Sequence, residues 1–336
     1  AAAVVTETIT LEKSHIVSPR VFYRQGEVYN TTLYSTMTLE DVEQEVERLQ
    51  KGDAFLICNI RGTTPSELRY LASRMQRLGA DALELCCFTP IGTKLEDISI
   101  RPEEIGEMVR GVTSAVEIPV TVRLPHHAAL NPAFARQITQ NGARAISAIE
   151  SLEGINGVDI ENARCEMAAI GGYTGSHLRP LSLAATAVLH QLADCEIAAM
   201  CGVEDWHSVI EFLMMGATTV QMGSAIMLQG YRHITETLRK LEGWLREKGY
   251  SSLDELRGKA LASLSAFEEL PERLLRAKMA APCDGICPDG CRARCVGACL
   301  YNAISLGENG IVVDAAACTG CGLCASLCPK KLFIMK

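Results

Sequence analysis

Residues 318–331 read CTGCGLCASLCPKK, a run in which four cysteines and a following proline stand at a fixed spacing. The cysteines are Cys318, Cys321, Cys324 and Cys328, and C-x2-C-x2-C-x3-C-P is a spacing by which thiolates hold [4Fe–4S] clusters. Three closely spaced thiolates bind one cluster, and the fourth cysteine reaches a second cluster in two-cluster domains. The stretch therefore predicts a small α+β domain folded around iron–sulfur clusters.

A second cysteine run, CPDGCRARCVGAC over residues 287–299, supplies the partner that a two-cluster domain needs. Its spacing is x3, x3, x3, so each early loop is one residue longer than in the first run. Crosswise ligation of bacterial ferredoxin type predicts one cluster on Cys287, Cys291, Cys295 and Cys328, and the other on Cys318, Cys321, Cys324 and Cys299. Cys283 is left over and is the alternative to Cys287 in a different register.

A structural zinc site and a single cluster with a degenerate partner are the competing interpretations of these cysteines. Zinc sites use separate cysteine pairs with a longer gap, whereas this run is continuous and ends in proline. The sequence thus favours two [4Fe–4S] clusters, with the cluster of Cys318, Cys321 and Cys324 the better defined one.

The bulk composition is that of a soluble globular protein with no nucleic-acid or membrane partner. The 336 residues are 48% hydrophobic and 21% charged, and their net charge of −8 disfavours polyanionic partners. No apolar stretch is long enough to span a bilayer, and AAAVVTETIT lacks the features of a secretory signal. Nine of the fifteen cysteines lie within 283–328, which is typical of metal binding rather than of a secreted disulfide scaffold. These features predict a cytoplasmic protein.

Residues 1–235 alternate short β-branched runs with helical patterns, which indicates a βα repeat around a buried parallel sheet. The candidate strands are AAVVTETI, AFLICNI, ALELCCF, PVTVRL, AISAI, EIAAMCG and TTVQMGS. The repeat length suits a β/α barrel or a doubly wound sheet, and no G-x-G-x-x-G follows the first strand. The expected division is a barrel over 1–235, a helical closing segment over 236–281 and a cluster domain over 282–336.

The order of several motifs resembles dihydroorotate dehydrogenases and, more closely, the barrel and ferredoxin portion of dihydropyrimidine dehydrogenases. The motifs are VVTETITL, FLICNIRG, GADALEL, IPVTVRL, GARAISAI, GGYTGSHLRPLSL and the run from CGVEDWHSV to VQMGSA. The resemblance implies an α/β TIM (β/α)8 barrel, here expected to lack its first strand and helix because the chain begins at the second.

The same resemblance implies a flavin mononucleotide (FMN) at the C-terminal mouth of the barrel. Its phosphate would lie on two glycine turns, and Thr6 and Arg123 would face the flavin. The phosphate-binding residues implied are Gly172, Gly202, Val203, Gly223 and Ser224.

Three positions depart from the family pattern around this site. Glu7 stands where the family has a flavin-facing lysine, and Cys86 and Glu150 stand where it has asparagines that hold a pyrimidine. Pyrimidine amides need paired donors and acceptors, which a thiol supplies poorly. We therefore expect a substrate other than orotate or uracil.

The catalytic acid or base has several candidates. The family uses a cysteine or serine on a loop, and the matching loop here offers Ser99, with Thr89 as a second choice. Ser99 also suits a helix N-cap before Pro102. His126, beside His127, follows the Arg123 strand and could donate a proton, and Cys86 occupies a position that contacts substrate.

The sequence therefore predicts an FMN- and iron–sulfur-dependent oxidoreductase acting on a C=C or CH–CH bond of a small substrate. Electrons would pass between the clusters and the flavin, and a ferredoxin or an NAD(P)H-oxidising subunit would be the redox partner. The alternatives are an electron-transfer subunit with no small substrate of its own, and a flavin-free scaffold for the clusters. A homodimer is compatible with the family, but nothing in the sequence fixes it.

Overall fold

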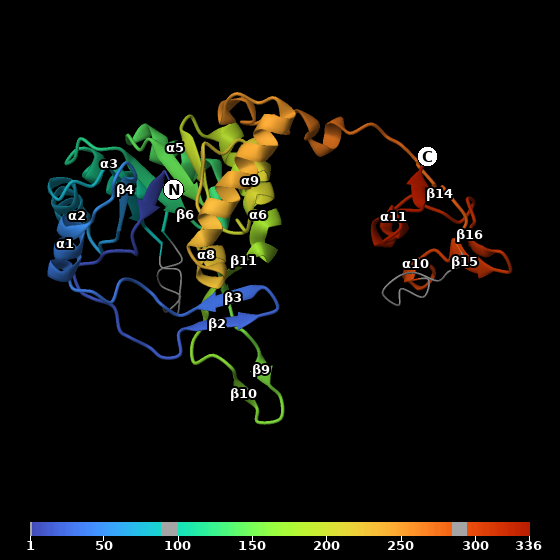
Figure 1. The fold of residues 1–336 in the computed structure, drawn as a ribbon, viewed down its shortest axis with the longest axis horizontal. Helices are drawn as coiled ribbons and strands as arrows, with labels where there is room; N and C mark the ends of the chain where they lie inside the picture. The colour runs from blue at the N-terminus through green and yellow to red at the C-terminus, as the bar shows by residue number, and fades with distance from the viewer. Residues whose placement is uncertain (1, 89–99, 284–293) are drawn as a thin grey trace. The chain divides into compact units, whose positions relative to one another are not determined.

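The computed structural model describes residues 2–88, 100–283 and 294–336, and the chain divides into two compact units, 1–264 and 265–336 (Figure 1). Four candidate residues, Thr89, Ser99, Cys287 and Cys291, lie outside the described residues. The sequence-based division at 235 and 281 stays a prediction. Among the described residues, no helix combines the length and apolarity needed to cross a membrane.

The first unit is built on a curled sheet of seven parallel strands, which confirms the barrel-type fold expected from the sequence. All seven candidate strands form, and they pair in chain order without a crossover between non-neighbours. The strands are β1 (Ala3–Val5), β4 (Phe55–Ile60), β5 (Ala82–Cys86), β6 (Val120–Leu124), β7 (Ala145–Ala148), β12 (Glu196–Ala199) and β13 (Thr219–Val220).

Helices follow the strands and cover the outside of the sheet (Figure 1). They are α1 (Leu39–Arg48), α2 (Pro65–Arg77), α3 (Pro102–Thr113), α4 (His126–Ala129), α5 (Pro132–Gln140), α6 (Arg179–Leu192), α7 (Trp206–Met214), α8 (Ser224–Gln229) and α9 (Arg232–Lys248). Helix α2 shows why they form, because Thr64 caps its first turn and proline stands at the first helical position. Its buried side chains recur at helical spacing and face the sheet: Leu68, Leu71, Ala72 and Met75.

The two faces of the sheet differ in chemistry. Successive side chains of a strand point to opposite faces, so in β5 Leu83 and Leu85 join the core under the helices while Glu84 faces the inside. Fully buried Asn59 and Ser147 reach the same interior from β4 and β7. The barrel interior is therefore polar, and the apolar core lies between sheet and helices.

A separate antiparallel sheet of four strands lies at one end of the barrel, on the side where β2 and β3 are labelled in Figure 1. Its strands, in spatial order, are β2 (Val21–Arg24), β3 (Glu27–Asn30), β11 (Gly171–Gly175) and β8 (Leu152–Gly154). A hairpin of β9 (Val158–Asp159) and β10 (Arg164–Cys165) extends beyond it. Sequence reasoning missed this sheet and read GGYTG as a turn, whereas these residues form β11.

The helical pattern expected over 236–281 is only partly realised. Helix α9 ends at Lys248, and the Gly249 that follows adopts a left-handed conformation with φ of 77°. After it the chain continues through three short 3₁₀ turns, Leu253–Glu255, Leu261–Ser263 and Phe267–Glu269.

The second unit pairs its first and last strands and places two short helices beside them. Strand β14 (Ala277–Met279) is antiparallel to β17 (Phe333–Met335), and β15 (Ile304–Gly307) is antiparallel to β16 (Gly310–Val313). The helices are α10 (Arg294–Ala298) and α11 (Leu323–Leu327). The α+β character expected for the cluster domain is therefore present.

Candidate active site and cluster site

A cavity of about 390 Å³ opens at the carboxyl ends of the parallel strands. Its walls come from residues that directly follow β1, β7, β12 and β13, from the ends of β5 and β6, and from β3 and β11 of the outer sheet. This is the end of a β/α barrel at which active sites are built. The outer sheet thus completes the wall of the cavity.

The cavity gathers most of the site residues that the sequence predicted. All seven residues expected to contact the flavin line it, together with Cys86: Thr6, Arg123, Gly172, Gly202, Val203, Gly223 and Ser224. The departing residues Glu7 and Glu150 also line it. His126 begins α4 and is not among the lining residues, and Ser99 lies outside the described part of the chain.

A buried carboxylate, Glu84, lies beneath the cavity at the centre of the barrel interior. It forms an ion pair with the Arg123 guanidinium. Three neutral donors complete its shell: Asn59 Nδ2 at 2.6 Å, Ser147 Oγ at 2.6 Å and Gln221 Nε2 at 3.1 Å. A buried charge is tolerated only when it is paired and hydrogen-bonded, and Glu84 meets both conditions.

Burial opposes the ionisation of Glu84, but Arg123 and the three donors outweigh it and keep the pKa of this carboxyl below its ordinary value. Burial likewise opposes the charge of Arg123, yet Glu84 and Glu150 raise the pKa of its guanidinium. The pair is therefore ionised, and Arg123 presents a fixed positive charge at the cavity.

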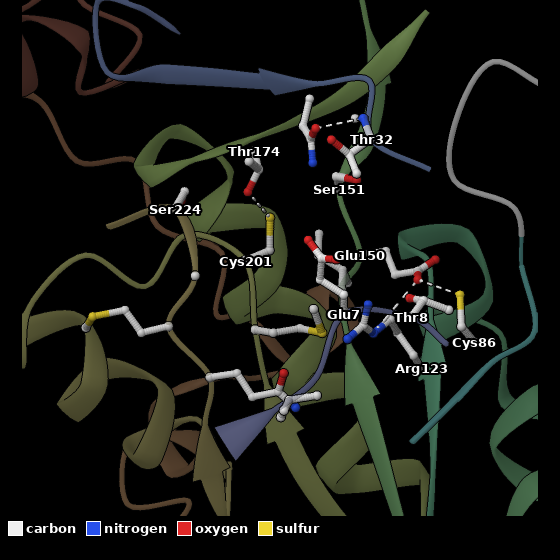
Figure 2. A pocket seen from close by; sticks show the side chains of 18 of the residues that line it. Glu7, Thr8, Thr32, Cys86, Arg123, Glu150, Ser151, Thr174, Cys201 and Ser224 are labelled. Carbon is white, nitrogen blue, oxygen red and sulfur yellow. Dashed lines mark hydrogen bonds and ion pairs between the residues drawn. The ribbon is translucent and has the colours of Figure 1, made fainter. Parts of the chain in front are cut away.

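Glu150 follows β7, is 5% exposed, and holds its carboxyl group between Arg123 and Cys86, as Figure 2 shows. Its Oε1 atom lies 3.6 Å from Cys86 Sγ and 3.9 Å from Arg123 Nε. The thiol has a second acceptor, the Phe88 carbonyl oxygen at 3.3 Å. Within the described residues, Arg123 Nε is buried without a hydrogen bond.

The pKa values of Cys86 and Glu150 both differ from those of ordinary side chains of the same type. Burial, together with the Glu150 charge, raises the pKa of the Cys86 thiol well above its usual value. Burial also raises the pKa of Glu150 to about 7, with Arg123 opposing the shift and Glu84 adding to it. Cys86 therefore stays a thiol, whereas the Glu150 carboxyl gains and loses a proton near neutral pH.

Two of the glycines expected to bind the flavin phosphate, Gly202 and Gly223, differ in their surroundings. A Cβ on Gly202 would lie 2.5 Å from the backbone of Arg179, and its φ of +87° also favours glycine. A Cβ on Gly223 would meet nothing within 4 Å. The backbone beside Gly223 is therefore open to the cavity, as a ligand phosphate requires.

These features fit a flavin. The cavity offers small residues and open backbone at one side, and at the other the fixed charge of Arg123 with an unbonded Nε atom. Thr174 Oγ1 and Cys201 Sγ, 3.5 Å apart, also lie in its wall (Figure 2).

Sequence reasoning missed the buried network around Glu84. A single acidic residue inside the apolar strand ALELC was the available signal, because a charge there must find partners. Its partners Asn59, Ser147 and Gln221 stand on three other strands or strand ends, so their convergence follows only from the register of the sheet.

In the second unit, four cysteines line one small cavity: Cys299, Cys318, Cys321 and Cys324. These are the four residues that the sequence assigned to one cluster. Gly320 has a φ of +78°, and a Cβ on it would lie 1.9 Å from the Leu275 carbonyl oxygen, so only glycine fits this turn. The Ala277 N–H donates to Cys318 Sγ at 3.4 Å, as backbone amides do around cluster sulfurs. The all-sulfur donor set fits an iron–sulfur cluster.

The remaining described cysteines of this unit lie in the same core. Cys283 and Cys295 are buried, and Cys328 packs against them. Among the described residues, no three His, Cys, Asp or Glu side chains converge on the position of a single metal ion.

Comparison with known proteins matches both units. The dihydroorotate dehydrogenase family model matches residues 1–245, and the 4Fe-4S binding domain model matches residues 311–331. The chain is 33% identical over 209 residues to the catalytic subunit of dihydroorotate dehydrogenase B (NAD(+)) of Thermococcus kodakarensis, covering 61% of this chain and 68% of that protein.

Two dihydropyrimidine dehydrogenases are also similar. Identity to the NAD-dependent dihydropyrimidine dehydrogenase subunit PreA of Escherichia coli is 28% over 246 residues, or 69% of this chain and 60% of that protein. Identity to the chloroplastic dihydropyrimidine dehydrogenase (NADP(+)) of Arabidopsis thaliana is 24% over 302 residues, or 81% of this chain and 71% of that protein.

The relatives are oxidoreductases that act on CH–CH donors. The matched family model covers the whole barrel unit up to α9, and the cavity and the cysteine cavity lie where a flavin and a cluster are expected. The chain therefore belongs to the dihydroorotate dehydrogenase family of flavin-dependent oxidoreductases, with a 4Fe-4S binding domain in its C-terminal unit.

Proposed function

We propose that this protein is an FMN- and iron–sulfur-dependent reductase of a C=C bond in a small substrate, with electrons passing between two [4Fe–4S] clusters and FMN. The observation that carries the proposal is the cavity at the carboxyl ends of the strands. One wall carries Gly202, Gly223 and Ser224, and another carries Arg123 and Glu150. Bound there, FMN would accept single electrons and deliver a hydride.

Different residues of the chain would contact the phosphate, the ring system and the substrate. Gly223 and Ser224 would contact the phosphate, where the backbone is open. Arg123, held in place by Glu84, would face the ring system and favour a negative charge on it. Asn30 of the outer sheet and Thr32, in the segment that follows β3, would cover the substrate and exclude water.

The substrate we propose is a small unsaturated carbonyl compound. The relatives are named for dihydroorotate and dihydropyrimidines, which supports a ring of related shape. Cys86 and Glu150, however, present a thiol and a carboxyl group at the cavity instead of amides. A site built to pair with pyrimidine amides discriminates through those hydrogen bonds, so uracil and orotate are expected to be poor substrates.

The electron donor we propose is a second protein, either a ferredoxin or an NAD(P)H-oxidising subunit. Two similar proteins are named as subunits of NAD-dependent enzymes, which supports a divided arrangement. The described cluster cavity is lined by Cys321, which is exposed. A thiolate near the surface suits electron exchange with a docked donor. A homodimer is compatible with this arrangement.

Anaerobic turnover with reduced methyl viologen tests the proposal. The panel contains uracil, orotate, unsaturated amides and cyclic imides, and oxidation of the viologen is followed with each. We expect turnover with at least one of the unsaturated amides or other cyclic imides, and lower rates with uracil and orotate. Electron transfer to an added protein acceptor with no turnover of any compound would favour the alternative, an electron-transfer subunit.

A further inference from the structure

We propose that Glu150 is the residue that exchanges a proton with the substrate, and that Cys86 and Arg123 position its carboxyl group. The inference rests on the proposed function and names the acid of that site. It assigns a catalytic role to a residue that is not among the candidate acids of the sequence, which are Ser99, Thr89, His126 and Cys86.

The position of Glu150 meets the geometric requirement for a proton donor. The residue lines the cavity and is only 5% exposed, so its carboxyl group faces the cavity rather than bulk water. Oε1 is held by Cys86 and Arg123. Oε2 accepts no hydrogen bond from any residue that the structure describes, which leaves it for the substrate.

The two candidate acids on this wall differ in which one can change its protonation state. The Cys86 thiol is buried beside Glu150, and it hydrogen-bonds both to that carboxyl group and to the Phe88 carbonyl oxygen. Loss of its proton would leave two negative groups 3.6 Å apart in a buried site. When Glu150 loses its proton, Arg123 faces the carboxylate and offsets much of the opposing effect of burial and of Glu84.

The charged and titratable groups that act on Glu150 come from three neighbouring strands or the residue that follows one: β5, β6 and the end of β4. Arg123 and Arg61 favour its ionised form, while Glu84 and burial oppose it, and the pKa settles at about 7. An acid with this pKa is present in both forms near neutral pH, which is the condition for efficient proton transfer. The groups that face it are Arg61, Glu84, Cys86 and Arg123.

The proposed step balances as follows in the direction of reduction. One carbon of the substrate double bond receives a hydride, two electrons and a proton, which the reduced flavin supplies. The neighbouring carbon takes a proton from Glu150, so an O–H bond breaks and a C–H bond forms. The carboxylate left behind faces Arg123 and regains its proton from water.

The test combines an infrared and a kinetic measurement on the purified holoprotein. The C=O stretch of a protonated carboxyl group is followed against pH in wild type, Glu150→Gln and Glu153→Gln, the last being an exposed control on β8. We expect a band that disappears with a midpoint near 7, is missing in Glu150→Gln and is unchanged in Glu153→Gln.

The kinetic part uses a panel compound that the wild type reduces with methyl viologen as donor. We expect Glu150→Gln to lower kcat about 100-fold or more, whereas reduction of the flavin by the viologen keeps its rate. Cys86→Ala should shift the midpoint of the carboxyl band.

The outcomes separate this inference from the proposed function. If the wild type turns over a panel compound and Glu150→Gln keeps kcat within a few-fold, Glu150 is not the acid and the proposed function stands. If the band is absent or titrates near the ordinary value of 4.5, the inference also fails. If the wild type turns over nothing, the proposed function fails, and this inference with it.

Discussion

At the scale of single residues, the barrel interior is organised by the ion pair of Glu84 and Arg123. Removing one partner of a buried pair costs far more than the pair contributes, because a charge stays buried without compensation. Three neutral donors remain around Glu84 in any Arg123 variant, and they soften this cost without removing it.

We predict that Arg123→Met lowers the free energy of unfolding by about 3–5 kcal/mol, measured by urea denaturation. Arg101→Met is the matched control, because the Arg101–Glu104 pair is exposed and its loss should cost much less. Equal losses in the two variants would contradict the role given to the buried pair.

Glu150 makes stability depend on pH in a direction that its raised pKa fixes. The folded protein holds the proton up to a pH of about 7, whereas the unfolded chain releases it near 4.5, so the stabilisation is complete below 4.5 and fades as pH rises to 7. We predict that the unfolding free energy of wild type falls by up to about 3 kcal/mol across this window relative to Glu150→Gln.

Urea denaturation at about pH 5 and about pH 8 measures this difference, with Glu153→Gln as the exposed control. Parallel pH dependences of wild type and Glu150→Gln would show that Glu150 has an ordinary pKa.

At the residue scale, the sequence identified the positions that line the cavity but not their partners. Arg123, Cys86 and Glu150 were recognised from strand ends and family pattern, and they lie together. Their contact with Glu84 could not be predicted, because it depends on which residues of neighbouring strands stand side by side.

At the scale of elements, the two loops expected to bind the phosphate allow the effect of the same substitution to be compared at Gly202 and at Gly223. Gly202→Ala forces a Cβ against the Arg179 backbone and places alanine at a φ of +87°. We therefore expect the free energy of unfolding to fall by about 1–3 kcal/mol. Gly223→Ala has open space and a φ of −125°, so the apoprotein should be almost as stable as wild type.

The same two variants test whether the flavin phosphate binds at these glycines. If the phosphate lies against the Gly223 backbone, the added methyl group weakens FMN binding although stability is unchanged, because close backbone approach requires glycine. Fluorescence titration of apoprotein with FMN measures this, and we expect at least about a tenfold rise in Kd. Unchanged affinity in Gly223→Ala would move the phosphate elsewhere.

The predicted strands agree with the structure where the local sequence pattern is strong, and the prediction failed for strands that pair with residues far away in the sequence. All seven parallel strands lie in short runs rich in apolar and β-branched residues, which local pattern detects. The outer sheet pairs β11 with β3, more than 140 residues earlier, and its glycine-rich strand resembles a turn. Local pattern holds no information about such a pairing.

At the scale of the whole molecule, the cysteines separate into two groups by role. Cys318, Cys321, Cys324 and Cys299 meet at one cavity, although Cys299 is distant in sequence. The motif predicted this grouping, because in two-cluster domains the fourth cysteine of each run binds the cluster of the other run. In the second set, Cys287 and Cys291 lie outside the described residues, and that grouping stays a prediction.

We predict that Cys321→Ser lowers the iron content and slows flavin reduction by a protein donor at least about tenfold, because one cluster loses a thiolate. Cys165→Ser, which changes an exposed cysteine on β10, is the control and should keep both. Iron analysis and stopped-flow absorbance measure the two effects. Full iron content in Cys321→Ser would remove this residue from the ligand set.

An anaerobic reductive titration of the purified protein with dithionite tests directly whether one chain holds both a flavin and the iron–sulfur clusters that reduce it. FMN takes two electrons and each cubane cluster takes one, so the account predicts about four electrons per chain, with bleaching of both flavin and cluster absorbance. Uptake of about two electrons, with only one of the two chromophores bleaching, would contradict it.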